Sequence, residues 1–134
     1  MAAKNLAQGW QVLIVDDQPD NLVVLKLAMQ RQGAEVYAAA NGIEALEMLA
    51  EVVPTVILLD LSMPQMNGWE FFEHVRSHES MMHVPIIAVT AHTSQHARST
   101  AEQMGFDGYI TKPINPLTLV ETIRDIMENT RQQF

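Results

Sequence analysis

The chain has 134 residues, of which 48% are apolar and 18% are charged, and this size and composition are typical of one globular domain. Its net charge of −8 argues against direct binding to nucleic-acid phosphates or to anionic lipid, because like charges repel. Cysteine is absent, which excludes disulfides and thiolate metal sites, and no apolar run approaches the roughly 18 residues of a membrane span, so we expect a soluble, cytoplasmic domain without membrane insertion.

Five short segments rich in β-forming residues follow one another along the chain. We expect strands at 11–16, 34–39, 55–60, 84–90 and 107–110. The third and fourth segments are apolar almost throughout, a pattern typical of strands that are buried on both faces of a parallel sheet.

Segments with helical spacing of apolar residues separate these strands. The apolar positions that define the first three helices are Leu22, Leu25 and Met29, then Ile43, Leu46, Leu49 and Val53, then Phe72 and Val75. We expect the third helix to begin near Asn67, the fourth to span about 94–104 and the fifth about 115–130. Strand and helix thus alternate five times, which predicts an α/β, doubly wound parallel sheet with right-handed crossovers.

Polar residues stand at the ends of these predicted strands. Asp16 and Asp17 close the first strand, Asp60 closes the third, Thr90 closes the fourth, and Lys112 lies just past the fifth. Ligands of such folds bind beyond the carboxyl ends of the strands, so we expect these five side chains to meet at one edge of the sheet.

Three converging carboxylates repel one another, at a cost of up to roughly 4 kcal/mol for each close pair. A hard cation relieves this repulsion, and Mg²⁺ prefers oxygen ligands of this kind. Lys112 offers a positive charge and Thr90 a hydroxyl donor for an oxyanion, so the set fits phosphoryl transfer to a carboxylate. Taken singly, either Asp16 or Asp17 would be a helix cap or a turn residue. The combination of all five favours a site.

The motifs "VDD", "LLDLSMPQMNG", "VTA" and "YITKP" resemble those of bacterial response-regulator receiver domains, in order and over nearly the whole chain. The chain looks like the stand-alone kind, similar to the chemotaxis response regulator. The resemblance implies a flavodoxin-like (βα)5 fold with strand order 2-1-3-4-5. It also implies an N-terminal extension at 1–10, a receiver domain at 11–132 and no output domain.

The same resemblance implies a role for each matching residue. Asp60 would be the phosphoacceptor, Asp17 and Asp60 would bind Mg²⁺ or Mn²⁺, and Asp16 would act through a metal-bound water. Ser62 would add its backbone carbonyl to the metal, while Thr90 and Lys112 would contact the phosphoryl group. Thr90 and Tyr109 would form the switch, and the Lys112–Pro113 peptide bond would be cis. Ser62 and His92 occupy positions that vary in the family, and we expect them to influence the lifetime of the phosphoryl group.

We therefore expect a signalling protein rather than an enzyme. Its partners would be a sensor histidine kinase or a histidine phosphotransfer protein, and a downstream protein effector. The alternative is a Mg²⁺-dependent phosphatase of the haloacid-dehalogenase kind, but that family needs an acid two residues after its nucleophile, where this chain has Ser62. A flavodoxin-like electron carrier is a third possibility, although "DDQPDN" offers carboxylates where a flavin phosphate needs hydroxyls and amides.

Overall fold

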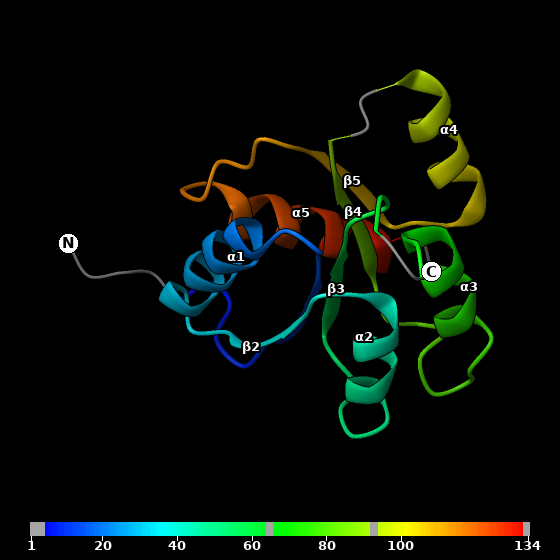
Figure 1. Ribbon diagram of the computed structural model, residues 1–134. Helices are drawn as coiled ribbons and strands as arrows, with labels where there is room; N and C mark the ends of the chain where they lie inside the picture. Colours follow the sequence, from blue (N-terminus) through cyan, green and yellow to red (C-terminus); the bar gives the residue numbers. More distant parts are fainter. Residues whose placement is uncertain (1–4, 64–65, 92–93, 133–134) are drawn as a thin grey trace.

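The structure of the protein is a computed structural model that describes residues 5–63, 66–91 and 94–132. Strands and helices alternate along these residues (Figure 1). The strands are β1 (Gln11–Val15), β2 (Glu35–Ala39), β3 (Val56–Leu59), β4 (Ile86–Thr90) and β5 (Gly108–Thr111). The helices are α1 (Pro19–Arg31), α2 (Gly42–Leu49), α3 (Gly68–Arg76), α4 (Gln95–Met104) and α5 (Leu119–Gln132).

The strands form one parallel sheet in the order β2-β1-β3-β4-β5, which confirms the expected fold. In its middle, Val12 of β1 pairs with Val36 on one side and Val56 on the other. At the last paired position of β4, Thr90 lies beside Thr111 of β5. Because every strand runs in the same direction, all their carboxyl ends meet at one edge of the sheet.

Helices cover both faces of the sheet, with α1 and α5 on one face and α2, α3 and α4 on the other (Figure 1). Successive residues of β1 therefore enter different cores: Val12 and Ile14 face α1 and α5, whereas Leu13 and Val15 face the other layer. Each such large side chain contributes about 1.5 to 3 kcal/mol when fully buried. This two-sided burial explains why the central strands are apolar almost throughout.

Polar caps begin the helices on the second face. The Asn67 side chain accepts from the Glu70 N–H, and the Glu70 carboxylate accepts from the Asn67 N–H, so the two form a capping box for α3. Ser94 caps α4 through its bond from the Ala97 N–H. The expected start near Asn67 and the expected range of the fourth helix are thus confirmed within a residue.

Two helical boundaries differ from the expectation. The fifth helix begins at Leu119 rather than near Asn115, because the Asn115 side chain accepts from the Leu117 N–H and folds the backbone into a turn first. The second helix ends at Leu49, so Val53 lies beyond it, and both Ile43 and Val53 are exposed. The expected apolar face over 43–53 was therefore wrong at both of its ends.

Residues 5–10 pack against the domain. Ala7 is fully buried, and its N–H donates to the Gln32 carbonyl at 3.0 Å. The Trp10 carbonyl accepts from the Glu35 N–H at 2.9 Å, which joins this segment to the start of β2. None of the helices in the described residues combines the length and the apolar content needed to cross a membrane.

Candidate functional site

Backbone hydrogen bonds position the candidate residues just beyond the strands. The Asp16 N–H donates to the Ala39 carbonyl at 3.1 Å, and the Asp60 N–H donates to the Val15 carbonyl at 2.9 Å. The Lys112 N–H donates to the carbonyl of Thr90 at 2.9 Å. The ladder of the parallel sheet thus continues through the first residue after each of these strands, which places the side chains at a common edge.

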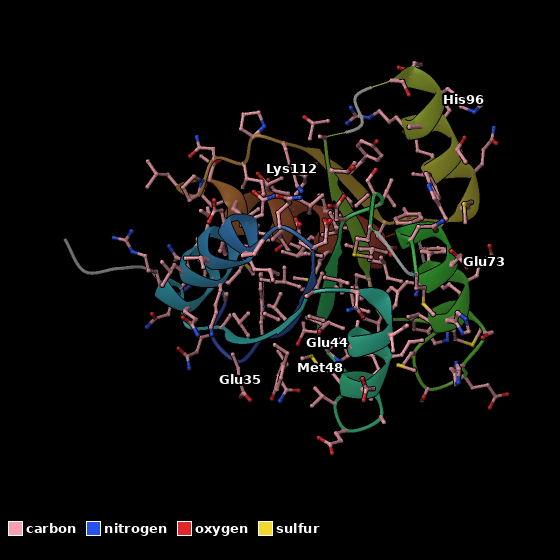
Figure 2. All side chains as sticks on the ribbon, viewed as in Figure 1. Glu35, Glu44, Met48, Glu73, His96 and Lys112 are labelled. Carbon is pink, nitrogen blue, oxygen red and sulfur yellow. The ribbon has the colours of Figure 1, made fainter. Side chains whose placement is uncertain are left out.

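The side chains of the three aspartates and of Lys112 converge as expected. The Lys112 ammonium lies 2.8 Å from Asp16 Oδ2 and 3.3 Å from Asp60 Oδ2, and it reaches from the loop after β5 toward the ends of the central strands (Figure 2). Asp16 and Asp60 are 1% and 5% exposed, whereas Asp17 is half-buried. One carboxylate of the three therefore lies toward solvent and the other two are buried beside the lysine.

A divalent cation fits the donor atoms of this edge. Oxygens of Asp16, Asp17 and Asp60 all lie within 4.8 Å of one another. Lys112 is the cation that contacts this group in the described residues, so three negative charges stand against one positive charge. Hard oxygen donors with excess negative charge are the donor set that Mg²⁺ and Mn²⁺ bind.

The pKa values of Asp60 and Lys112 are both raised at this edge. Burial raises the pKa of Asp60, and Asp16 adds to this effect, although the Ser62 N–H and Lys112 act in the opposite direction. Burial alone would lower the pKa of Lys112, but its hydrogen bond to Asp16 and the charges of Asp60 and Asp16 outweigh burial and raise that pKa. Lys112 is therefore held as a cation against the two buried carboxylates.

Thr90 and Ser62 are two further expected site residues that the structure describes. Thr90 is fully buried at the end of β4. Ser62 is exposed, and its N–H donates to Asp60 Oδ1 at 3.1 Å. His92 lies outside the described residues. The Lys112–Pro113 peptide bond is cis, as expected from the resemblance.

Tyr109 is half-buried on β5, where it is paired with Ala88 of β4. Its ring packs at the margin of the core on the α2–α4 side. The Arg98 guanidinium of α4 lies over this ring, with Cζ at 5.2 Å from the ring centroid. Burial raises the pKa of Tyr109 above the ordinary tyrosine value, although the charge of Arg98 acts in the opposite direction.

Two further residues support the site. The Gln18 N–H donates to Asp16 Oδ1 at 2.9 Å and so orients that carboxylate. Gly68 begins α3 against the acceptor loop, and a Cβ at this position would lie 2.5 Å from the Asp60 carbonyl oxygen and 2.7 Å from Leu61 Cα. Only glycine lets the helix approach so closely. In the sequence, this glycine directly follows Asn67, at the expected start of the third helix.

Comparison with known proteins agrees with this geometry. Residues 12–124 match the family described as the response regulator receiver domain. An uncharacterised 14.6 kDa protein from the sodA1 3′ region of Leptolyngbya boryana is 36% identical over 121 residues, which cover 90% of this chain and 92% of that protein. The polar-differentiation response regulator DivK of Brucella anthropi is 32% identical over 116 residues, with 87% and 94% of the two chains covered.

Solved structures show the same fold. The chemotaxis response regulator CheY4 of Vibrio cholerae superimposes with a TM-score of 0.82 at 34% identity, covering 87% of this chain and 98% of that one. The matched range, 12–124, contains all three aspartates as well as Thr90 and Lys112. The chain therefore belongs to the response regulator receiver domain family of two-component signalling proteins.

Proposed function

We propose that this receiver domain accepts a phosphoryl group on Asp60 and thereby changes its binding to a partner protein. The observation that supports this proposal is the pairing of the Lys112 ammonium with two buried carboxylates, beside a third carboxylate that faces solvent. Asp60 is the member of this group that lies beside both the lysine loop and the end of β4, where Thr90 is buried.

In the proposed reaction, a carboxylate oxygen of Asp60 attacks the phosphorus of a phosphohistidine on the donor. The N–P bond breaks, its electron pair returns to the imidazole ring, and an acyl phosphate forms on Asp60. Lys112 and the Thr90 hydroxyl then stabilise the new phosphoryl oxygens through charge-assisted hydrogen bonds. Lys112 already contacts Asp60, and its N–H bond to the Thr90 carbonyl joins it to the end of β4.

Asp17, Asp60 and the backbone carbonyl of Ser62 would hold Mg²⁺ or Mn²⁺, with Asp16 acting through a water molecule. When bound, the cation neutralises negative charge on the carboxylates and on the phosphoryl oxygens. The three aspartates supply oxygens at spacings that fit such an ion. The half-buried position of Asp17 leaves one side of the group open to solvent.

A sensor histidine kinase or a histidine phosphotransfer protein would be the donor, in the cytoplasm. A groove between α1 and the segment before α5 offers apolar surface for it, lined by Val24, Leu27, Ala28, Arg31, Gln32, Pro116 and Leu117. Val24, Leu27 and Leu117 are large apolar side chains that are 41%, 55% and 80% exposed. Exposed apolar residues gathered along one groove are typical of a protein contact.

The phosphatase alternative is not favoured. A phosphatase of the haloacid-dehalogenase kind needs a general acid two residues after the nucleophile. Ser62 stands there, exposed, and its N–H donates to Asp60.

The test is a screen of purified histidine kinases for phosphoryl transfer, with acetyl phosphate as a small donor. We expect Mg²⁺-dependent labelling that is lost in Asp60→Asn and retained in Asp20→Asn, which changes an exposed carboxylate in the first turn of α1. Borohydride trapping and mass spectrometry would locate the label. A label that persists in Asp60→Asn would overturn the proposal.

A further inference from the structure

The fourth helix is weakly anchored to the rest of the domain. Along α4, Ala101 is the residue whose side chain is fully buried, whereas α3 buries Phe71, Phe72 and Val75. Elements with few buried apolar contacts open and shift most easily. Individual side-chain contacts between α4 and the sheet therefore have a large influence on its position.

One such contact joins Arg98 of α4 to Tyr109 of β5. The Arg98 guanidinium carbon lies 5.2 Å from the centroid of the tyrosine ring, within the range of a cation–π interaction. Arg98 is exposed and Tyr109 is half-buried, so the ring lies between the charge and the core. No salt bridge to Arg98 is found in the part of the chain that the structure describes, so no carboxylate there competes with the ring.

Tyr109 is also close to the acidic edge along the sheet. It pairs with Ala88 in the strand that ends at Thr90, and Lys112 follows it by three residues, just past the end of β5. A movement of Thr90 or Lys112 toward a phosphoryl group would therefore displace this ring. Movement of the ring away from its observed position would change its contact with Arg98.

We propose that Arg98 is a positioning residue that holds the Tyr109 ring in its observed place and thereby sets how strong a signal at Asp60 must be to move it. This inference rests on the proposed function, in which Tyr109 is part of the switch. Its chemistry is the attraction of a guanidinium to the negative face of an aromatic ring. Arg98 acts on the switch only through Tyr109 and takes no part in the phosphoryl chemistry.

The expected effect is modest and measurable. An exposed cation–π contact corresponds to a factor of about two to five in an equilibrium constant. Loss of the contact should shift the equilibrium between ring positions by that factor. Because linkage is reciprocal, the concentration of a phosphoryl analogue needed for half-saturation should fall by the same factor.

The experiment compares the parent with Arg98→Ala, Arg98→Lys and Arg124→Ala. The last removes an arginine of α5 that is paired with Glu128, and it serves as a matched control for loss of surface charge. Tyrosine rings are labelled with ¹³C and followed by NMR during titration with beryllofluoride and Mg²⁺. The chain has two tyrosines, so Tyr37 on β2 provides an internal reference for general unfolding.

We expect Arg98→Ala to shift the Tyr109 ring signals before any beryllofluoride is added and to lower the midpoint of the titration two- to fivefold. Arg98→Lys should retain most of the parent behaviour, because an ammonium also binds the ring face. Arg124→Ala should match the parent. Unchanged Tyr109 signals in Arg98→Ala, an unchanged midpoint, a lysine variant that behaves like alanine, or an equal change in Arg124→Ala would overturn the inference.

The two proposals fail in different ways. If beryllofluoride does not bind the parent, the proposed function fails, while the ligand-free comparison of Tyr109 signals still tests the contact with Arg98. If beryllofluoride binds and moves the Tyr109 ring equally in all four proteins, the proposed function stands and the role of Arg98 is wrong.

Discussion

Two ion-pair clusters lie at opposite ends of the same sheet and differ in their charge balance. At the carboxyl ends of the strands, Lys112 pairs with Asp16 and Asp60, beside Asp17. At the other end, Arg76 of α3 pairs with Asp107 at 3.1 Å, just before β5. The first cluster carries excess negative charge, and the second is neutral.

The Arg76–Asp107 cluster is closed by further contacts. Arg76 donates to the Val84 carbonyl at 2.8 Å, and Asp107 Oδ2 accepts from the Ile86 N–H at 2.8 Å. The guanidinium also lies over the ring of Phe72, at 5.0 Å from the centroid. These contacts tie the end of α3 to the beginnings of β4 and β5.

The difference shows how charge balance separates a structural cluster from a reactive one. Arg76 and Asp107 neutralise each other and also bond to the backbone at Val84 and Ile86, so their charges are balanced without a ligand. The aspartates near Lys112 exceed the charge of their partner, so the fold alone leaves them repelling one another. Such excess charge favours the binding of a cation.

The largest expected effect is the loss of the neutral cluster. Arg76→Met would leave the partly buried Asp107 carboxylate without its partner, and we expect the free energy of unfolding to fall by on the order of 3 kcal/mol. Urea denaturation measures this change. In Asp107→Asn the amide oxygen can still accept from the Ile86 N–H, so a double-mutant cycle of the two changes isolates their coupling. Additive effects would contradict the comparison.

Removing one charge from the other cluster should act in the opposite direction on stability. Asp17→Asn should raise the free energy of unfolding in EDTA by on the order of 1 kcal/mol, because it relieves repulsion at a partly exposed position. It should also weaken Mg²⁺ binding by roughly tenfold or more, or about 1.4 kcal/mol, since it removes a ligand. Calorimetric titration with Asp20→Asn as the control tests this, and equal Mg²⁺ affinity in the parent and Asp17→Asn would contradict it.

The pH dependence of stability should distinguish the clusters further. Because the pKa of Asp60 is raised in the folded state, folding favours its protonated form. In EDTA, its stabilising contribution is fully present below the ordinary aspartate value of 3.8 and is lost as pH rises through the folded pKa. The difference in unfolding free energy between the parent and Asp60→Asn should therefore change across this window. A difference that is constant with pH would exclude the raised pKa.

The smallest expected effect concerns an exposed ion pair. Arg124 and Glu128 lie one turn apart on α5 at 3.7 Å, and their side chains are 43% and 57% exposed. Arg124→Gln should change the free energy of unfolding by less than about 0.5 kcal/mol, because water and salt screen such pairs. Urea denaturation beside Arg76→Met gives the contrast between a closed cluster and an open pair. A larger effect would mean that burial does not explain the difference between the two ion pairs.

Local patterns in the sequence were sufficient to locate the strands. Their predicted ranges agree with the structure within two residues at each end, because continuous apolar runs and flanking breakers are local signals. The polar residues after the strands were found for the same reason, and parallel topology then requires their convergence. The expected apolar face of the second helix was wrong at its ends, because apolar spacing continues to Val53 although the helix ends at Leu49.

The sequence by itself determined the alternation of elements, the apolar strands and the acidic edge, because each depends on residues that are close together or on the common direction of the strands. Tertiary structure decided which charges pair. Arg76 reaches Asp107 across 31 residues, Lys112 reaches Asp16 across 96, and Arg98 lies over Tyr109. No local period encodes these contacts, because they depend on how the helices pack on the sheet and on how much solvent that packing removes around each charge.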